Sequence, residues 1–355
     1  MSTSPETSQT GPGTAPSPLP QVGKKLDLRR YFAGIAGELT EVEERIRRQA
    51  REFDPSILGY VEYAIESKGK RIRPALVLLT AQATGGVRKE TQAGHHTLAV
   101  IVEMIHLATL VHDDIMDGAS KRRGQPTANA KWGAELSVLL GDCLFAHALK
   151  LCTHYETHEI NRQIADASRE VCSGEILQTQ RRFDLKLTIP EYLKIVSMKT
   201  GALFRVSTDL AAYLNGVNED QRQAARVYGD CLGLAYQIYD DCLDIAATEQ
   251  TIGKTTGTDL LKGKLTLPLL HVLQQDLGPE KERLAEMILH GNGDDHQQLL
   301  RVVLDRGGLA YSVRKIQKYL EEAVRALDVL PPGPSRDHLQ GIPTALMDHV
   351  GTLAR

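Results

Sequence analysis

The stretch that decides the fold is residues 100–117, which read VIVEMIHLATLVHDDIMD. Its apolar residues recur at three- and four-residue spacing, which is the period of a helix and not that of a strand. The stretch ends in three acidic residues, Asp113, Asp114 and Asp117, in line with its apolar face. A solvated acidic stripe does not normally continue a core face, so these carboxylates are candidates for a function.

The same acidic spacing occurs a second time, at Asp240, Asp241 and Asp244, at the end of another apolar helical stretch. In each motif the first and last aspartates lie four residues apart and share one face of a helix, where like charges repel. Divalent cations between the carboxylates would remove this repulsion, and ligands that are all oxygen point to Mg²⁺ rather than zinc. The sequence therefore predicts a magnesium site at Asp113, Asp117, Asp240 and Asp244.

A third acidic pair, Asp294-Asp295, serves as an internal comparison. It follows Gly-Asn-Gly, and Gln298 stands where the third carboxylate would be. A solvated acidic face is the alternative interpretation of every such cluster. We adopt it for this pair alone and expect the pair to lie on a surface loop.

Segments with helical periodicity follow one another along most of the chain, separated by short breaks rich in Gly, Pro or Asn. Only 5% of the 355 residues are aromatic, so the core should be aliphatic, which favours helix over strand. No repeat of fixed period and no linker-like composition occurs after residue 25. We expect one all-α domain over residues 25–355, with helices that include 99–111, 136–152, 164–177, 192–214 and 221–245.

The composition excludes several classes of partner and compartment. Lys and Arg total 42 and Asp and Glu 45, a net charge of −3, so no overall basic field attracts nucleic acid or an anionic membrane. Five cysteines without a CxxC pair favour a reducing compartment over a disulfide framework. The longest apolar stretch is interrupted by Glu103 and His106, so we expect no stable membrane insertion.

Residues 1–24 differ from the rest of the chain because they are rich in Ser, Thr, Pro and Gly. They contain no basic region followed by an apolar region, as a signal peptide would. We expect a disordered N-terminal tail on a cytoplasmic protein.

Basic residues gather in sequence near both acidic motifs. Arginine binds phosphate oxygens in a bidentate way, and lysine supplies a mobile point charge. One basic group alone is most often a solvated face, but two acidic helices flanked by cationic loops indicate a polyphosphate shared between metal ions and side chains. The P-loop pattern GxxxxGK[ST] is absent from the sequence. The basic residues concerned are Lys70, Arg73, Arg122, Arg123, Lys199, Lys254 and Lys264.

Together these motifs resemble the trans-isoprenyl diphosphate synthase (polyprenyl synthetase) family, from about Leu26 to the C-terminus. The resemblance is closest to octaprenyl and other medium- to long-chain synthases. It rests on motifs in the family's order, at 69–74 (GKRIRP), 106–117, 122–124, 174–178 (GEILQ), 199–200 (KT), 237–244 (QIYDDCLD) and 253–268.

The resemblance implies an isoprenoid-synthase-type helical bundle around a deep central cavity, with both aspartate motifs at its mouth, and a homodimer. It implies Mg²⁺-dependent head-to-tail (1′-4) condensation of isopentenyl diphosphate with an allylic prenyl diphosphate. In this chemistry metal ions and cations stabilise the departing diphosphate while an allylic carbocation forms in an apolar cavity.

The resemblance also assigns roles to residues by position. The metal and catalytic residues are Asp113, Asp117, Asp240, Asp244, Lys199 and Arg122, with Asp114 and Asp241 contributing directly or through water. The residues for the allylic diphosphate are Arg122, Lys199, Thr200, Gln237, Lys254 and Lys264. The residues for isopentenyl diphosphate are Lys70, Arg73, His106 and Arg123.

The helix before the first aspartate motif carries a prediction about product length. Thr109 and Ile105 lie below the first aspartate, with Ala108 beside Thr109. In this family a bulky aromatic at the positions of Ala108 and Thr109 stops chain growth early. Both residues are small here, so we expect an all-trans product longer than geranylgeranyl, with Phe145 or Leu149 as the tunnel floor. Simple helix packing is the alternative explanation of these small residues.

Three other functions stay open on the sequence alone. A short-chain (farnesyl or geranylgeranyl) diphosphate synthase would share these motifs. A non-catalytic partner subunit of a heteromeric synthase would be expected to lack acidic residues of the motifs, and none is missing here. A class I terpene cyclase also uses an aspartate motif with Mg²⁺, but it needs no second diphosphate site of the kind that Lys70, Arg73 and Arg123 provide.

Overall fold

The computed structural model describes residues 26–66, 69–86, 89–246, 258–351 and 353. Within these ranges the all-α prediction is confirmed, and the only strands are two residues long and pair as an antiparallel hairpin. The elements in chain order are α1 (Arg29–Phe32), η1 (Ala33–Ile35), α2 (Ala36–Gln49), η2 (Ala50–Glu52), α3 (Leu58–Ile65), α4 (Ile72–Ala83), α5 (Lys89–Met116), β1 (Lys121–Arg122), β2 (Gln125–Pro126), α6 (Ala128–Trp132), α7 (Ala134–Cys152), α8 (His158–Gln180), α9 (Ile189–Val196), η3 (Ser197–Gly201), α10 (Ala202–Leu214), α11 (Glu219–Ala246), α13 (Thr258–Leu261), α14 (Leu267–Leu273), α15 (Glu280–His290), α16 (Gly293–Asp305), α17 (Gly308–Ala326), η4 (Leu327–Val329) and α18 (Pro334–Val350).

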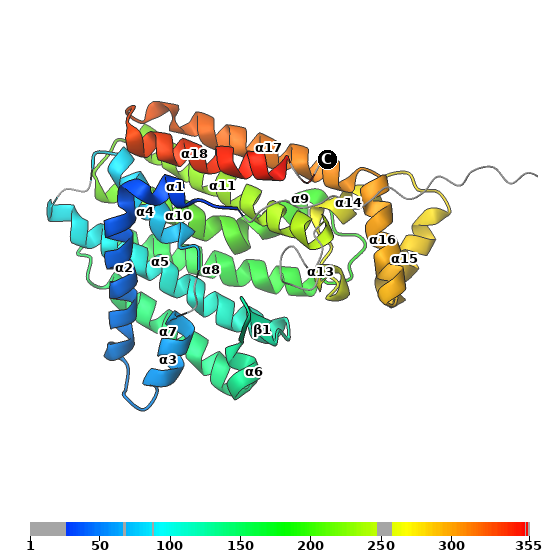
Figure 1. Ribbon diagram of the computed structural model, residues 1–355, viewed down its shortest axis with the longest axis horizontal. Helices are drawn as coiled ribbons and strands as arrows, with labels where there is room; N and C mark the ends of the chain where they lie inside the picture. Colours follow the sequence, from blue (N-terminus) through cyan, green and yellow to red (C-terminus); the bar gives the residue numbers. More distant parts are fainter. Residues whose placement is uncertain (1–25, 67–68, 87–88, 247–257, 352, 354–355) are drawn as a thin grey trace, which may run out of the picture.

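The long helices run side by side along the long axis of the molecule (Figure 1). Helices α5, α8, α10 and α11 lie in the middle, α17 and α18 cover one side, and α7 with α3 and α6 lies on the other. Helix α5 packs against α4, α7 and α10, and α11 packs against α10 and α17. The two helices that carry the aspartate motifs therefore belong to the same bundle.

Helix α5 lies at the centre because its middle is apolar on every face. All residues from 98 to 105 are buried, and Glu103 is the only charged one among them. A helix that is hydrophobic all round needs neighbours all round, which α4, α7 and α10 provide. The charge of Glu103 is balanced by Arg71, whose Nη1 donates to Oε1 of Glu103 at 2.6 Å.

The breaks in the sequence pattern coincide with helix ends. Helix α9 begins with a capping box, in which Thr188 Oγ1 accepts from the Glu191 N–H and the Glu191 carboxylate accepts from the Thr188 N–H. Gly118 after α5 has a φ of +59° and Gly216 after α10 a φ of +65°. Glycine adopts this left-handed conformation at little cost, and it ends both helices.

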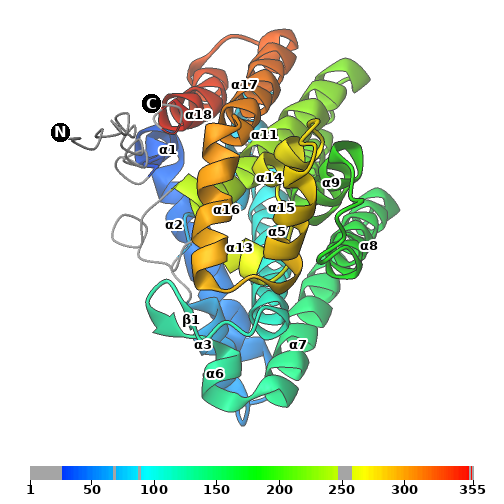
Figure 2. The ribbon, with the colours of Figure 1, turned by 90° about the vertical axis from the view of Figure 1, so that its right-hand side faces the viewer.

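The aspartate motifs come at the C-terminal ends of α5 and α11. Figure 2 faces this end of the bundle, where the shorter helices α13, α14, α15 and α16 lie. Helices α13 and α14 both pack against α11. The segment that follows the second motif is therefore placed beside both motifs.

The acidic pair Asp294-Asp295 does not lie in a loop, so that expectation was wrong. It forms the first turn of α16, where Asn292 Oδ1 accepts from the two N–H groups at 2.8 and 3.2 Å. Asp295 in turn accepts from the Asn292 N–H at 3.0 Å. An asparagine followed three residues later by an acid is a helix-start pattern, and it outweighs the turn preference of the neighbouring glycines.

Three further expectations concern the N-terminal tail, membrane insertion and the cysteines. The tail predicted for residues 1–24 lies outside the described residues. In the described ranges, no helix combines the length and the apolar character needed to cross a lipid bilayer. The five cysteines are free thiols on α7, α8 and α11, and three of them are buried.

Candidate active site

The last aspartate of the first motif meets cations from two other segments. Asp117 accepts from Lys264 Nζ at 2.8 Å and lies 3.3 Å from Arg182 Nη2 and 3.6 Å from Lys262 Nζ. Arg182 follows α8, and the two lysines follow α13. Lys264 is among the predicted site residues, whereas Arg182 and Lys262 are not.

The first aspartate of this motif, Asp113, faces Lys199 of the turn Ser197–Gly201. Lys199 Nζ lies 3.9 Å from Asp113 Oδ2, donates to Gln178 Oε1 at 2.9 Å and forms an ion pair with Glu175. Burial opposes the charged form of Lys199, but Asp113 and Glu175 outweigh this effect and raise the pKa of Lys199 above its usual value. Lys199 is therefore a fixed positive charge next to Asp113.

The middle aspartate of the first motif has a different role from its neighbours. Asp114 is buried, and Arg122 of β1 binds it with Nε at 2.9 Å and Nη2 at 2.7 Å from Oδ1. This ion pair holds the β1–β2 hairpin against α5. About a third of the Arg122 side chain stays exposed (30%), so the predicted contact of Arg122 with an allylic diphosphate stays a prediction.

The middle aspartate of the second motif is the centre of a chain of hydrogen bonds. Asp241 is buried, and it accepts from the hydroxyl of Tyr192 and from Gln237 Nε2 at 2.9 Å. Thr200 Oγ1 in turn donates to Gln237 Oε1 at 2.8 Å. Burial and the negative charge of Asp259 raise the pKa of Asp241 to about 8.

The last aspartate of the second motif lies beside α13. Asp244 accepts from the N–H and hydroxyl of Thr258, at 3.2 and 3.1 Å, and from the Asp259 N–H at 3.0 Å. Asp240, the first aspartate of this motif, is exposed. Burial and the charges of Asp244 and Asp117 raise the pKa of Asp259 to about 6. Asp259 therefore lies within electrostatic range of one aspartate from each motif.

Asp113 and Asp117 differ in their electrostatic surroundings. Burial raises the pKa of Asp113 to about 6, although Lys199 opposes the shift. Burial acts on Asp117 in the same direction, but the hydrogen bond and charge of Lys264 and the charge of Lys262 outweigh it, and the pKa of Asp117 falls below its usual value. The charged form of Asp117 is therefore favoured by its lysine partners, whereas burial disfavours the charged form of Asp113.

A second group of cations lies around Tyr236 of α11. Lys70 Nζ lies 5.9 Å from the centre of the Tyr236 ring. Burial raises the pKa of Tyr236, and the positive charges of Arg73 and Arg123 oppose that shift. Arg123 lies against Gly69, where an added Cβ atom would be 3.1 Å from Arg123 Nη1. The structure thus brings together residues predicted to bind isopentenyl diphosphate.

His106 of α5 belongs to this second group as well. Burial and the charges of Arg73, Arg123 and other arginines lower the pKa of His106 well below its usual range, so its imidazole is neutral. Arg73 is itself affected by burial, which lowers its pKa, and its buried Nε has no hydrogen-bond partner among the described residues. A buried donor without an acceptor is costly, so a ligand that supplies an acceptor would be stabilised here.

The end of the bundle that carries the aspartate motifs contains a small pocket of about 70 Å³. Among the described residues, no three His, Cys, Asp or Glu side chains lie close enough together to hold a metal ion by themselves. The possible ligands are carboxylate oxygens, a donor type that suits a divalent cation which also keeps waters and shares phosphate oxygens. The polar residues on the cavity lining are Gln178, Arg181, Tyr192, Lys199, Gln237, Asp241, Asp259, Lys264 and Thr266.

The residues predicted to set product length lie on α5 below the first motif. Ile105 and Ala108 are fully buried, and Thr109 is half-buried with Oγ1 donating to the His106 carbonyl at 2.7 Å. Leu149 is 38% exposed on α7. It lies on the surface of the single chain because α7 turns this face outward, and the prediction that Phe145 or Leu149 forms the tunnel floor stays a prediction.

Five residues of the site were not among those predicted for it, and one predicted residue is not described. The five additions are Glu175, Arg182, Tyr192, Asp259 and Lys262. Glu175, Asp259 and Lys262 stand inside sequence motifs of the family, so the sequence alone could have identified them. Arg182 and Tyr192 carry no local signal because only the fold brings them to Asp117 and Asp241. Lys254 lies outside the described residues.

Comparison with known proteins agrees with this geometry. The fold is that of a polyprenyl synthase from Caulobacter crescentus CB15, with a TM-score of 0.83 and 32% identity over 94% of this chain and 99% of that one. That crystal structure is a complex with calcium and isoprenyl diphosphate. Residues 54–304 match the sequence model of the family described as polyprenyl synthetase. This chain belongs to the polyprenyl synthetase family.

The similarity to two known relatives extends over most of the length of each relative. The all-trans-nonaprenyl-diphosphate synthase (geranyl-diphosphate specific) of Rhodobacter capsulatus is 34% identical over 327 residues, 92% of this chain and 99% of the relative. The octaprenyl diphosphate synthase of Escherichia coli K12 is 35% identical over 289 residues, 80% of this chain and 87% of the relative. The similarity therefore covers both aspartate motifs and both groups of cations.

Proposed function

We propose that the chain condenses isopentenyl diphosphate head-to-tail (1′-4) with an allylic prenyl diphosphate. The products are diphosphate and an all-trans polyprenyl diphosphate longer than geranylgeranyl. The observation that carries the proposal is the separation of the cations into two groups, one at Asp113 and Asp117 and one around Tyr236. Two diphosphate substrates need two such groups, whereas a cyclase needs one. The names of the nonaprenyl and octaprenyl relatives support this activity and product class.

The allylic diphosphate would occupy the group at the first motif. Lys199 and Lys264 now lie at Asp113 and Asp117, and phosphate oxygens are equivalent acceptors for their ammonium groups. A diphosphate between the lysines would therefore replace their carboxylate partners, and a divalent cation would then balance the charge of the released aspartates. The other residues that we place on this substrate are Arg122, Thr200, Gln237 and Lys254.

We propose Mg²⁺ as the cofactor, held by Asp113, Asp117, Asp240 and Asp244 together with substrate oxygens. Burial, together with neighbouring carboxylates, raises the pKa values of Asp113, Asp241 and Asp259, and a divalent cation at this place would favour their charged forms. When bound, Mg²⁺ supplies charge stabilisation for the leaving diphosphate. The calcium in the Caulobacter relative supports a divalent cation at this place.

The second group would hold isopentenyl diphosphate through Lys70, Arg73, His106 and Arg123. The unpartnered Nε of Arg73 would donate to a phosphate oxygen, and neutral His106 would donate one hydrogen bond without adding charge. The allylic C–O bond breaks, the isopentenyl double bond forms the new C–C bond, and the proton lost from isopentenyl passes to the released diphosphate. No nucleophilic side chain is needed.

Product length would depend on the α5 residues below the first motif. Ala108 and Thr109 present small side chains, so the growing chain would pass them and extend toward Ile105. We expect Ala108→Phe or Thr109→Phe to shorten the product. Chromatography of the dephosphorylated products checks this, and an unchanged distribution would refute the position of the tunnel.

We also propose a homodimer that uses the outer face of α7. Four large apolar side chains of α7 and one of α8 are between 38% and 60% exposed, an unusual density for a free surface. Leu139→Glu should convert the dimer to monomers in size-exclusion chromatography with light scattering. A wild-type protein that is already monomeric would refute the proposal. The exposed residues are Leu136, Val138, Leu139, Leu149 and Ile176.

Labelled isopentenyl diphosphate tests the activity directly. The purified chain, given Mg²⁺ and a panel of allylic primers, should incorporate label into linear products longer than geranylgeranyl. Products that stop at geranylgeranyl would identify a short-chain synthase. A cyclic product would identify a cyclase, and incorporation that requires a second protein would identify a partner subunit.

A further inference from the structure

Lys199 and Thr200 are carried by a turn that departs from regular helix. Residues 189–214 form one continuous helix in which Ser197–Gly201 adopts the π conformation, with the Ala202 N–H bonded to the Ser197 carbonyl. A π-turn closes its hydrogen bond over five residues instead of four, so it accommodates one additional residue in the helix. Such turns are rare, and they are frequent at functional sites.

This additional residue brings two polar side chains onto one face. Tyr192 and Thr200 are eight residues apart, which in a regular helix would rotate them about 80° relative to each other. The π-turn accommodates one of these eight residues, so Tyr192 and Thr200 are related as residues seven apart in a regular helix. Seven residues make about two full turns, which places both side chains on the same face. Both reach the same pair on α11, because Tyr192 donates to Asp241 and Thr200 to Gln237.

Two glycines allow the turn to come this close to its neighbours. A Cβ atom on Gly174 of α8 would lie 2.7 Å from the Lys199 backbone nitrogen. A Cβ atom on Gly233 of α11 would lie 2.9 Å from the Gly201 Cα atom. Backbone atoms cannot move aside as the ends of flexible side chains can. The π-turn therefore packs directly against α8 and α11 at two positions where the glycine has no side chain.

A set of polar contacts holds the turn from the side of α11 and α8. Ser197 Oγ donates to Asp230 Oδ1 at 3.2 Å, and Arg205 Nη1 donates to the same oxygen at 3.0 Å. The other arm of Arg205 forms an ion pair with Glu170 of α8. The Asp230 oxygen also lies against Gly201, where a Cβ atom would be 2.9 Å away. One carboxylate therefore contacts both ends of the π-turn.

We propose that Asp230, oriented by Arg205, is a positioning residue that sets the π-turn and thereby aims Lys199 and Thr200 at the allylic diphosphate. This inference rests on the proposed function for its substrate. Asp230 and Gln237 are seven residues apart and share one face of α11. This face therefore fixes the π-turn at two points, since Asp230 binds Ser197 and Gln237 binds Thr200. The hydrogen bonds described for Asp230 come from Ser197 of the turn and from Arg205. Asp230 would therefore affect the substrate only through the position of the turn.

The test compares Asp230→Ala and Asp230→Asn with a matched control. Asp230→Ala should raise KM for the allylic diphosphate about 10-fold, since small displacements of positioning groups are costly. It should leave KM for isopentenyl diphosphate unchanged, because that substrate is assigned to the group around Tyr236. Asp230→Asn keeps an acceptor for Ser197 and should recover part of the loss. The control is Asp166→Asn, which removes a carboxylate paired with Arg162 and Arg169 on the outside of α8.

A double mutant shows whether Asp230 acts through Lys199. If it does, Asp230→Ala should cost little further in a Lys199→Ala background, since groups that act as a unit are not additive. Additive losses, or equal changes in both KM values with a lower melting temperature, would indicate a general structural role and overturn the proposal.

Hydrogen exchange tests the turn independently of activity. In Asp230→Ala the amides of residues 197–202 should exchange faster than in the wild type, while those of the control stay unchanged. Unchanged exchange at these amides would overturn the proposal. A wild type that incorporates no isopentenyl diphosphate would instead refute the proposed function, and the exchange rates would still decide whether Asp230 sets the turn.

Discussion

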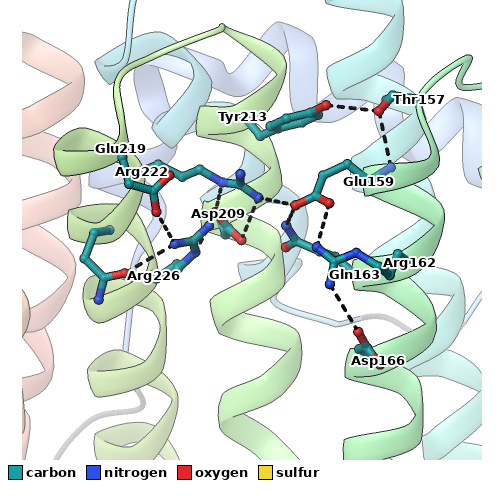
Figure 3. Close-up of polar contacts among 11 residues, drawn as sticks. Thr157, Glu159, Arg162, Gln163, Asp166, Asp209, Tyr213, Glu219, Arg222 and Arg226 are labelled. Atoms are coloured by element: carbon teal, nitrogen blue, oxygen red, sulfur yellow. Dashed lines mark hydrogen bonds and ion pairs between the residues drawn. The ribbon is translucent and has the colours of Figure 1, made fainter.

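The two ends of helices α8, α10 and α11 are both crowded with charge, but they balance it in opposite ways. At the end shown in Figure 3, Asp209 is buried and accepts from Arg222 Nε at 2.6 Å and Arg226 Nε at 3.1 Å. Arg222 also contacts Glu159 at 3.0 Å, and Arg226 contacts Glu219 at 2.6 Å. Each acid labelled in this view has an arginine partner.

At the aspartate-motif end the carboxylates differ among themselves. Asp114 and Asp117 are paired with Arg122 and Lys264, whereas the described hydrogen bonds to the buried Asp241 come from the uncharged Tyr192 and Gln237. Burial and the charge of Asp259 raise the pKa of Asp241 to about 8. Hydrogen bonds from Arg162 and Arg222, by contrast, lower the pKa of Glu159 to about 2. The first end is a completed structural network, whereas the second contains buried carboxylates whose charged form is disfavoured until a ligand supplies positive charge. This difference separates a group that stabilises the fold from one that binds.

Asp113→Asn should give the largest effect, a loss of activity without any loss of stability. Loss of a metal ligand and of one charge at the leaving diphosphate removes several kcal/mol of transition-state stabilisation, so kcat should fall about 1,000-fold. Initial rates of isopentenyl incorporation measure this, and thermal unfolding should show no destabilisation. A variant with more than a tenth of wild-type kcat would contradict the role of the first motif.

Asp209→Asn is the matched change at the opposite end, and it should act on stability alone. The substitution removes the buried carboxylate that Arg222 and Arg226 share. The free energy of unfolding should therefore fall by about 3 kcal/mol. Urea denaturation should show this loss, with kcat and both KM values retained in the folded fraction. If kcat fell as far as in Asp113→Asn, the distinction between the two ends would be lost.

Gly174→Ala should give a smaller effect that involves both properties. The added methyl meets backbone at the π-turn, so stability should fall by about 2 kcal/mol through overpacking, and KM for the allylic diphosphate should rise. Gly37→Ala is the control, because nothing lies within 4 Å of its Cβ position. The control should gain about 0.5 kcal/mol from reduced chain entropy, as measured by urea denaturation. Equal effects of the two changes would contradict the close approach at Gly174.

The smallest effects should appear in the pH dependence of stability, and they should have opposite signs. The pKa of Glu159, about 2, lies below its usual 4.5, so its contribution is present above pH 4.5 and lost as the pH falls toward 2. The pKa of Asp113, about 6, lies above its usual 3.8, so its contribution is present below pH 3.8 and lost as the pH rises through 6.

Urea denaturation with EDTA at several pH values compares the two variants. Glu159→Gln should destabilise the protein at pH 7 and lose that effect below pH 4.5. Asp113→Asn should stabilise the metal-free protein at pH 7 and have little effect at pH 4. The same sign for both variants at pH 7 would contradict the contrast between the two ends.

Much of the fold was predictable because its signals are local. Apolar spacing of three and four residues placed α5, α7, α8 and α11, and the repeated aspartate spacing selected the two functional helix ends. The Asp294-Asp295 pair was misplaced because its helix-start signal lies in Asn292, one residue before the glycine that suggested a turn. Helix boundaries depend on such single capping residues.

The site was predictable in its residue types but not in its pairings. Lys199 and Lys264 could be named from their motifs, yet their partners Glu175 and Asp117 depend on how α8 and the segment after α13 pack. The π-turn has no sequence signal, because it arises from the fit of Ser197–Gly201 between the two glycines. The paired role of Asp114 with Arg122, and the outward position of Leu149, likewise follow from tertiary packing.

The account depends most directly on the two aspartate motifs acting together on one diphosphate. A crystal structure with Mg²⁺ and an unreactive allylic thiodiphosphate tests this in one measurement. We predict metal ions that join the diphosphate to Asp113 and Asp117 on one side and to Asp240 on the other, with Lys199 and Lys264 on its oxygens. A diphosphate bound elsewhere, or bound by one motif with the other facing bulk solvent, would contradict it.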